Sequence, residues 1–329
     1  MDQALFIGWL GYLTTPLTIL AVLALSRVAP IPPHYHPLTL LSGLASNLQK
    51  KVYPNAERPV LQQQIAGALG TLMLIAPSLI ILAIIGMVSE FPVLWNALLL
   101  YLALDWEQTR RTAIRIAAQL EKGYKLQARE SLNSLVLRQS GRLSSMGIAK
   151  ACIETLLQRA NLQLFAVLFW FAIGGGLMAV TYRALRELAM VWNGKDPFFK
   201  QFASLPAALT ILMDAIPTRL LAFSYALSGS LKPWFKLSYH WQKTFPNNHA
   251  GLLLSCGGSA LKLGLGGPLY YQQLKQQRPR LDTGAEPQAV DILRTLRLIN
   301  NAISFWLAIT LVIALTIGLL SQLLPSLSS

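Results

Sequence analysis

Residues 153–170 read IETLLQRANLQLFAVLFW, and this stretch changes from polar to apolar near its middle. The first half carries Glu154, Thr155 and Arg159, and the apolar character of the second half continues as far as residue 182. A helix needs about 20 mostly apolar residues to cross the hydrocarbon core of a bilayer. The stretch therefore predicts a transmembrane helix over 162–182 that is entered through a polar rim.

The composition of the chain extends this reading to the whole molecule. Of its 329 residues, 53% are hydrophobic and only 13% are charged, and the mean hydropathy is +0.46. The net charge of +14 comes from Lys and Arg that gather between apolar spans rather than in a basic tail. Such charges set topology and meet lipid headgroups. We expect an integral membrane protein with membrane lipids, and no nucleic acid, among its partners.

The apolar spans predict an all-α integral membrane protein, a bundle of five to six transmembrane or re-entrant helices with cytoplasmic amphipathic helices. The expected location is the bacterial cell (plasma or inner) membrane, crossed several times. Two spans are weaker because one is short and the other contains prolines and charged residues. The clear spans are 4–25, 65–88, 162–182 and 302–324, and the weaker ones are 91–104 and 203–228.

The distribution of basic residues predicts the orientation. Lys and Arg outnumber acids in 107–160 and in 230–300, so both segments are expected in the cytoplasm together with the 27–64 loop. The "SEFP" turn and both termini are then expected outside. We interpret 1–329 as a single membrane domain that carries the cytoplasmic segments 106–160 and 230–300.

The segment 106–157 predicts three consecutive amphipathic helices. Gly123 supplies the stop of the first helix, "QSGR" at 139–142 closes the second, and Ser144 or Ser145 can cap the third. The predicted apolar faces are Ile114, Ala117, Ala118 and Leu120 in the first helix, Leu132, Leu135 and Val136 in the second, and Ile148, Cys152, Ile153 and Leu156 in the third.

No generic motif names a reaction. The glycine-rich stretch CGGSALKLGLGG at 256–267 lacks the GxxxxGK[ST] pattern of a phosphate-binding loop, so a turn or a close approach of helices is the better explanation. His34 and His36 have no carboxylate or cysteine cluster beside them, and the two cysteines form no metal-binding spacing. We predict no metal site from these residues.

Six segments, taken in order, resemble one known family. They are HPLTLLSG at 36–43, ARESLNSLVLRQ at 128–139, LSSMGIAKACIETL at 143–156, LFWFAIGGGLMAVTYRAL at 168–185, IPTRLLA at 216–222 and LGLGGPLYY at 263–271. This order is similar to that of the CobD/CbiB cobalamin-biosynthesis membrane proteins. The resemblance implies an acid–amine ligase of the adenosylcobinamide-phosphate synthase type. Such an enzyme joins aminopropanol or its phosphate to cobyric acid, with ATP and Mg²⁺ as cofactors and a corrinoid as substrate.

The polar patterns of that family are only partly kept. The family patterns are ETxxENxxD, NTxDSM, DDxxNxxPxRL and PNxGxxxxA. Glu154 and Thr155 keep the start of the first pattern, and Pro217 and Arg219 keep the end of the third. The replacements are Gln158, Arg159 and Leu162 in the first pattern, Arg186 and Ala189 in the second, and Thr210, Ile211 and Asp214 in the third. Either this chain uses a different charge arrangement or it has lost the family chemistry.

These residues define the candidate site. The catalytic candidates are the acids Glu154, Glu187 and Asp214, and the metal-ligand set is left empty. The predicted binding residues for an anionic ligand are Arg159, Arg183, Arg186, Arg219, Thr155 and Tyr182. Asp214 and Arg219 flank Pro217, which we expect to bend their helix so that both reach an interior polar site.

Three functions remain open at this level. The first is a cobalamin-pathway protein that acts on a corrinoid, and the second is a non-catalytic AmpE-like membrane sensor or regulator that binds an anionic ligand or partner. A transporter is the weaker third, because no paired, similarly broken spans are present. The sequence does not decide between a monomer and an oligomer.

Overall fold

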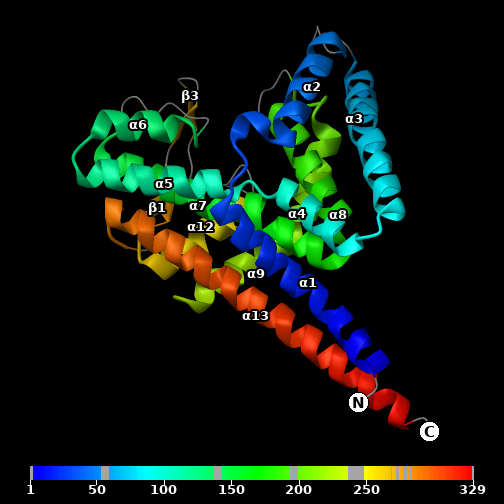
Figure 1. Cartoon of the computed structure of the whole chain (residues 1–329). Coiled ribbons are helices and arrows are strands. Elements are labelled where there is room, and N and C mark those ends of the chain that lie inside the picture. The colour runs from blue at the N-terminus through cyan, green and yellow to red at the C-terminus, as the bar shows by residue number, and fades with distance from the viewer. Residues whose placement is uncertain are drawn as a thin grey trace. The chain divides into compact units, whose positions relative to one another are not determined.

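The computed structural model describes residues 3–52, 59–136, 143–192, 199–235, 248–267, 269–271, 274–276, 280–281 and 284–327. The described chain is almost entirely helical, as Figure 1 shows. The prediction of an all-α fold is therefore confirmed. Four short strands form two antiparallel pairs, which the sequence did not predict. The helices and strands belong to two compact units, each made of segments that are distant in sequence.

The first unit comprises residues 1–104, 166–214 and 307–329. Its helices pair closely, above all α4 with α8 and α2 with α8. It contains α1 (Gln3–Val28), the short 3-10 turn η1 (Pro33–Tyr35), α2 (Pro37–Val52), α3 (Val60–Val88), α4 (Pro92–Ala103), α8 (Ala166–Val191), the first part of α9 (Ser204–Leu227) and the end of α13 (Ala289–Leu327).

The second unit comprises residues 105–165 and 215–306. Within it α5 packs on α6 and α7, and α12 packs on α7 and α10. It contains α5 (Trp106–Glu121), α6 (Lys125–Asn133), α7 (Ser145–Ala160), the π-helical turn η2 (Asn161–Phe165), the second part of α9, α10 (Lys232–Phe235), α12 (Asn248–Leu261), β1 (Leu265–Gly266), β2 (Leu269–Tyr271), β3 (Leu274–Gln276), β4 (Arg280–Leu281) and the first part of α13.

Four helical runs are long and apolar enough to cross a membrane: Val60–Val88, Ser145–Val191, Ser204–Leu227 and Ala289–Leu320. They contain three of the four clear predicted spans and the proline-containing weaker span, which forms one helix. The apolar segment Leu13–Val28 is shorter. The other weaker span is the 12-residue helix α4, about 18 Å long; a helix shorter than the hydrocarbon core can still cross it where the bilayer thins or flanking residues reach the interface. These helices make the chain a membrane protein.

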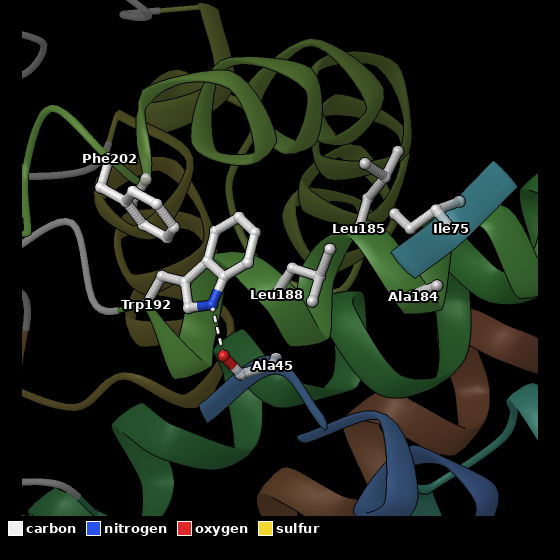
Figure 2. Packing of buried hydrophobic residues seen from close by; sticks show 8 residues of the cluster. Ala45, Ile75, Ala184, Leu185, Leu188, Trp192 and Phe202 are labelled. Carbon is white, nitrogen blue, oxygen red and sulfur yellow. Dashed lines mark hydrogen bonds between the residues drawn. The ribbon is translucent and has the colours of Figure 1, made fainter. Parts of the chain in front are cut away.

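The core of the first unit forms around Trp192 at the end of α8. Its indole nitrogen Nε1 donates to the carbonyl oxygen of Ala45 in α2 at 3.1 Å, as the dashed line in Figure 2 shows. The ring of Phe202 packs edge-on against the indole with centroids 4.7 Å apart. A buried indole thus finds both apolar contacts and an acceptor for its N–H, which fixes α2 against α8.

A break in α8 lies within the predicted span 162–182. Gly174 and Gly175 leave helical geometry, and Gly175 adopts φ +66°, which is accessible at little cost only to glycine. The side-chain oxygen of Asn96 in α4 accepts from the backbone N–H of Gly176 at 2.8 Å. A backbone donor freed by the break is therefore satisfied inside the unit, as an apolar surrounding requires.

The amphipathic helices of the second unit follow the sequence only in part. Gly123 ends the α5 segment with φ +77°, and Ser144 caps α7 by accepting from the N–H of Gly147 at 3.1 Å, so both predictions are confirmed. The apolar residues predicted for the third helix are buried. The face predicted for the first is only partly right, because Ala117 is buried but Ile114 and Ala118 are exposed. The "QSGR" segment at 139–142 lies outside the described residues.

The glycine-rich stretch 256–267 forms the end of α12 and the turn into β1. A Cβ atom on Gly257 would lie 2.6 Å from Cδ1 of Leu157 in α7, so this glycine permits a close approach of the two helices. Gly266 and Gly267 both have positive φ and form the turn that follows. The prediction of a turn and a close helix approach is confirmed.

Candidate functional site

Glu154 lies buried on α7 and holds the glycine turn of the second unit. Its Oε1 accepts from the backbone N–H of Gly266 at 2.9 Å. Gly266 is the second residue of β1 and pairs with Arg280 in β4. A carboxylate that accepts from a backbone N–H makes a charge-assisted hydrogen bond, about twice as strong as a neutral one. Glu154 therefore anchors this turn, whatever further role it has.

Arg159 lies at the end of α7 and also serves the second unit. Its Nη2 donates to the carbonyl oxygen of Leu135 at 2.8 Å, and its Nη1 lies 3.3 Å from the hydroxyl oxygen of Thr109. Leu135 directly follows the C-terminal end of α6, where a cation interacts favourably with the free carbonyls of the helix. The guanidinium of Arg159 thus ties α6 and α5 to α7.

A string of polar side chains, which the sequence analysis missed, runs through the π-helical turn η2. The amide of Gln163 donates to Oδ2 of Asp105 at 3.2 Å and accepts from the hydroxyl of Thr109 at 2.7 Å. The Nδ2 of Asn161 donates to the hydroxyl oxygen of Thr218 at 2.9 Å. Single π-helical turns within α-helices frequently mark functional sites. In the sequence, the amide side chains of Asn161 and Gln163 within an otherwise apolar run could have indicated this polar site.

The strongest concentration of buried charge lies in the first unit, on the facing parts of α8 and α9. The hydroxyl of Tyr182 donates to Oδ1 of Asp214 at 2.7 Å, and Nη1 of Arg186 lies 3.6 Å from Oδ2 of the same carboxylate. Arg183 is only 2% exposed, and its charge acts on the hydroxyl of Tyr182 together with that of Arg186. The structure thus brings four of the predicted site residues together.

Two other predicted site residues, Glu187 and Thr155, make contacts outside this cluster. Oε1 of Glu187, next to Arg186 on α8, accepts from the hydroxyl of Ser42 in α2 at 2.5 Å. The hydroxyl of Thr155 donates to the carbonyl oxygen of Ala151 within α7 at 2.8 Å. A threonine hydroxyl that bonds back to its own helix needs no ligand to satisfy its donor.

Arg219 does not occupy the interior position that the sequence predicted. Its side chain is exposed, and Nη1 donates to the carbonyl oxygen of Ala215 one turn earlier in α9, at 2.6 Å. Residues five apart on a regular helix point about 140° from each other, and α9 continues as one helix through Pro217. The buried Asp214 is instead paired with groups from α8. The interior placement of Arg219 was therefore wrong.

The donor set decides which kind of ligand these residues suit. Mg²⁺ prefers several free oxygen ligands. The three candidate acids already accept hydrogen bonds from Gly266, Ser42 and Tyr182, and Asp214 also faces a guanidinium. Among the described residues, no group of three His, Cys, Asp or Glu side chains could hold a metal ion. Each of the three candidate acids thus has a hydrogen-bond partner of its own, whereas the arginines on α8 suit an oxyanion.

Comparison with known proteins gives a consistent picture. A family model described as CobD/Cbib protein matches residues 19–299. A protein of Chromobacterium violaceum named cobalamin biosynthesis protein CobD is 30% identical over 298 residues, which cover 90% of this chain and 96% of that protein. Proteins of the same name from Stutzerimonas stutzeri and Clostridium perfringens are 30% and 25% identical over 302 and 297 residues. These cover 90% and 86% of this chain, and 96% and 91% of the relatives.

No solved structure gives a significant match to the chain. The names of the relatives favour the biosynthetic hypothesis over that of a membrane sensor. The family match covers most of the chain, including the charge cluster on α8 and α9 and the glycine turn held by Glu154. This chain is a cobalamin-biosynthesis-type membrane protein and belongs to the CobD/CbiB protein family.

Proposed function

We propose that the chain acts in cobalamin biosynthesis as a multi-pass protein of the bacterial plasma (inner) membrane, where it binds a corrinoid or another anionic small molecule. Membership of the CobD/CbiB family carries this proposal, because the match covers nearly the full length of both this chain and its relatives. Four apolar helical runs support the membrane location. The arginines of α8 support an anionic ligand.

Genetic complementation tests the proposal. The chain is expressed in a bacterium that lacks its own CobD-type protein, and growth is measured in a medium where cobalamin synthesis is essential but cobinamide is withheld. Restored growth, together with cobalamin detected by mass spectrometry, is the expected result. A well-expressed, membrane-inserted chain that supports no cobalamin formation would contradict a role in the pathway.

The ATP-dependent step requires a separate assay. Because most acids of the family patterns are replaced in this chain, we expect the purified protein in lipid to form no amide from cobyric acid and aminopropanol phosphate with ATP and Mg²⁺. A family member that keeps the acidic patterns is the positive control, and mass spectrometry detects the product. Clear turnover would overturn this expectation and show that ATP and Mg²⁺ are used through other residues.

Glu154 offers a sharper variant for the same assays. Glu154→Gln keeps an acceptor for the N–H of Gly266, whereas Glu154→Ala removes it. If Glu154 acts by anchoring the glycine turn, the glutamine variant should complement nearly as well as the parent and the alanine variant should not. Equal loss of function in both variants, with the glutamine variant still folded, would show that the carboxylate takes part in the chemistry.

A further inference from the structure

We propose that Arg183 and Arg186 on α8 form a binding site for an oxyanion, a phosphate or a carboxylate group, with Asp214 as the resident counter-charge. The inference rests on the proposed function, because it names the ligand chemistry of that protein. Its binding test needs neither a corrinoid nor biosynthetic activity. A failure of one proposal can therefore be told from a failure of the other.

The first observation is the balance of charge around Asp214. One buried carboxylate lies among two guanidinium groups, both of which act electrostatically on the hydroxyl that Asp214 binds. Guanidinium groups stay protonated in proteins. The next acid along α8, Glu187, directs Oε1 at the hydroxyl of Ser42 in α2. Among the described residues, this cluster thus gathers two guanidinium groups and one carboxylate in an apolar helical run, where buried charge is costly.

The second observation is the unused donor capacity of Arg186. Its Nε is buried and makes no hydrogen bond to any part of the chain that the structure describes. Its Nη1 lies 3.6 Å from Oδ2 of Asp214, which is longer than the roughly 2.7–2.9 Å of a charge-assisted hydrogen bond. Nε and Nη of one guanidinium can together bind two oxygens of a carboxylate or phosphate. An oxyanion bound on the Nε side of the Arg186 guanidinium would accept the hydrogen bond that Asp214 does not accept.

The third observation concerns access. The side chain of Arg186 is 18% exposed, whereas that of Asp214 is 2% exposed. Arg186 is therefore the member of the cluster that a ligand reaches first. The carboxylate of Asp214 lies behind it and competes with the ligand for the same guanidinium. Removal of that negative charge should consequently strengthen binding of an oxyanion rather than weaken it.

The oxyanion has two sources with the same chemistry. It is either the phosphate of a lipid headgroup, which is abundant around a helix that crosses a membrane, or a phosphate or carboxylate of a soluble substrate. Both satisfy the guanidinium in the same way. The experiment therefore measures binding once in a detergent without phosphate and once in a lipid bilayer, so that the two sources can be distinguished.

In the first arm, the purified full chain in dodecyl maltoside, a phosphate-free detergent, is titrated with inorganic phosphate and with pyrophosphate by calorimetry. Arg186→Gln should weaken binding by about tenfold or more, since it removes a charged donor. Asp214→Asn, which keeps an acceptor for the hydroxyl of Tyr182, should tighten it by several-fold. Arg115→Gln is the matched control, because it removes an exposed guanidinium of α5 and should leave binding unchanged.

In the second arm, the chain is placed in nanodiscs with phosphatidylglycerol, and retained lipid is measured by native mass spectrometry. Lipid that is held by the parent and lost in Arg186→Gln identifies a headgroup as the ligand. Binding of phosphate without retained lipid identifies a soluble oxyanion. The proposal is overturned if the parent binds neither, if Arg186→Gln binds like the parent, or if Asp214→Asn binds more weakly. If Arg186→Gln fails to fold, the phosphate affinity of Asp214→Asn relative to the parent tests the proposal by itself.

Discussion

At the residue scale, two of the three charged departures from the family patterns, Arg186 and Asp214, face each other. Arg186 and Asp214 both stand where the family patterns have asparagine, and the structure places them 3.6 Å apart. Each charge alone would be costly in an apolar helical run, whereas together they partly neutralise each other. The replacements are therefore better understood as one exchange of a polar pair for a charged pair than as two separate losses.

This interpretation predicts an energetic coupling between the two side chains. Arg186→Asn alone should destabilise the fold by removing a guanidinium paired with the Asp214 carboxylate, and Asp214→Asn alone by leaving the guanidinium groups of α8 without that acid. The double variant should recover about 1–3 kcal/mol relative to the sum of the single changes, as expected for neighbours in one network. Unfolding by SDS in mixed micelles measures all four proteins. Strictly additive effects would show that the two residues are independent.

A second prediction at this scale concerns the hydroxyl of Tyr182. Tyr182→Phe removes the donor that Oδ1 of Asp214 accepts at 2.7 Å in a buried site. Loss of a hydrogen bond to a charged group should lower the free energy of unfolding by about 1–3 kcal/mol. Tyr225→Phe is the matched control, since Tyr225 is also fully buried but its hydroxyl has no hydrogen-bond partner among the described residues. Equal losses in the two variants would rule out a specific role for the Tyr182 hydroxyl.

At the element scale, close packing of helices depends on particular glycines. A Cβ atom on Gly67 in α3 would lie 1.9 Å from the carbonyl oxygen of Phe202, a backbone atom that cannot turn aside. Gly67→Ala should therefore force the chain apart and cost about 1–3 kcal/mol in the free energy of unfolding. Gly43→Ala in α2 meets no atom within 4 Å and should be neutral or stabilising by up to about 1 kcal/mol. A larger loss of stability in Gly43→Ala than in Gly67→Ala would contradict this packing.

The start of α5 supports a prediction about pH. Burial alone would raise the pKa of Glu107, but hydrogen bonds and charges from Arg110 and Arg111 outweigh it and hold the pKa below its ordinary value. Arg110 binds both carboxylate oxygens, at 2.7 and 2.8 Å. A carboxylate with a lowered pKa in the folded state stabilises the protein above its ordinary pKa, and this contribution is lost as the pH falls through the lowered value.

Glu107→Gln should therefore reduce stability at neutral pH and flatten the loss of stability below pH about 4, where the parent protonates this group. Thermal unfolding in detergent between neutral and acid pH measures the difference. Glu90→Gln, which changes an exposed acid of the α3–α4 turn, is the control and should leave the acid limb unchanged. Parallel curves for the parent and Glu107→Gln would exclude a contribution from this ion pair.

The sequence predicted the elements better than it predicted their faces. Long apolar runs reveal helices because lipid contact requires them, so most of the spans were found. The buried side of α5 was missed because it carries Glu107, Thr109 and Thr112 beside Ala113 and Ile116. A hydrophobic pattern cannot show that Glu107 finds its partners within its own helix. The exposed Ile114 therefore misled the assignment.

In the candidate site, too, contacts within one helix could be predicted from the sequence, whereas contacts between helices could not. Tyr182 and Arg186 lie one turn apart on α8, so their common side could be predicted from spacing alone. Their meeting with Asp214 depends on how α8 packs against α9, which no local pattern contains. Arg219 was paired with Asp214 because the two are close in sequence, although helical geometry points them apart.

At the scale of the whole molecule, the membrane topology can be tested independently of function. Basic residues in 107–160 and 230–300 predict that both segments lie in the cytoplasm, with the turn at Glu90 outside. Both native cysteines, Cys152 and Cys256, are buried, and burial raises the pKa of the Cys256 thiol to about 12. Neither reports topology well, because a buried, protonated thiol reacts slowly with maleimides.

Single cysteines introduced at exposed positions of a Cys152→Ala, Cys256→Ala background avoid this problem. Tyr124→Cys lies in the turn between α5 and α6, and Glu90→Cys lies between α3 and α4. In intact cells, a membrane-impermeant maleimide should label the Glu90→Cys protein and spare the Tyr124→Cys protein. Permeabilised cells should label both, which serves as the control for reactivity. Labelling of Tyr124→Cys in intact cells would invert the orientation and place the segment 107–160 outside the cytoplasm, against the distribution of its Lys and Arg residues.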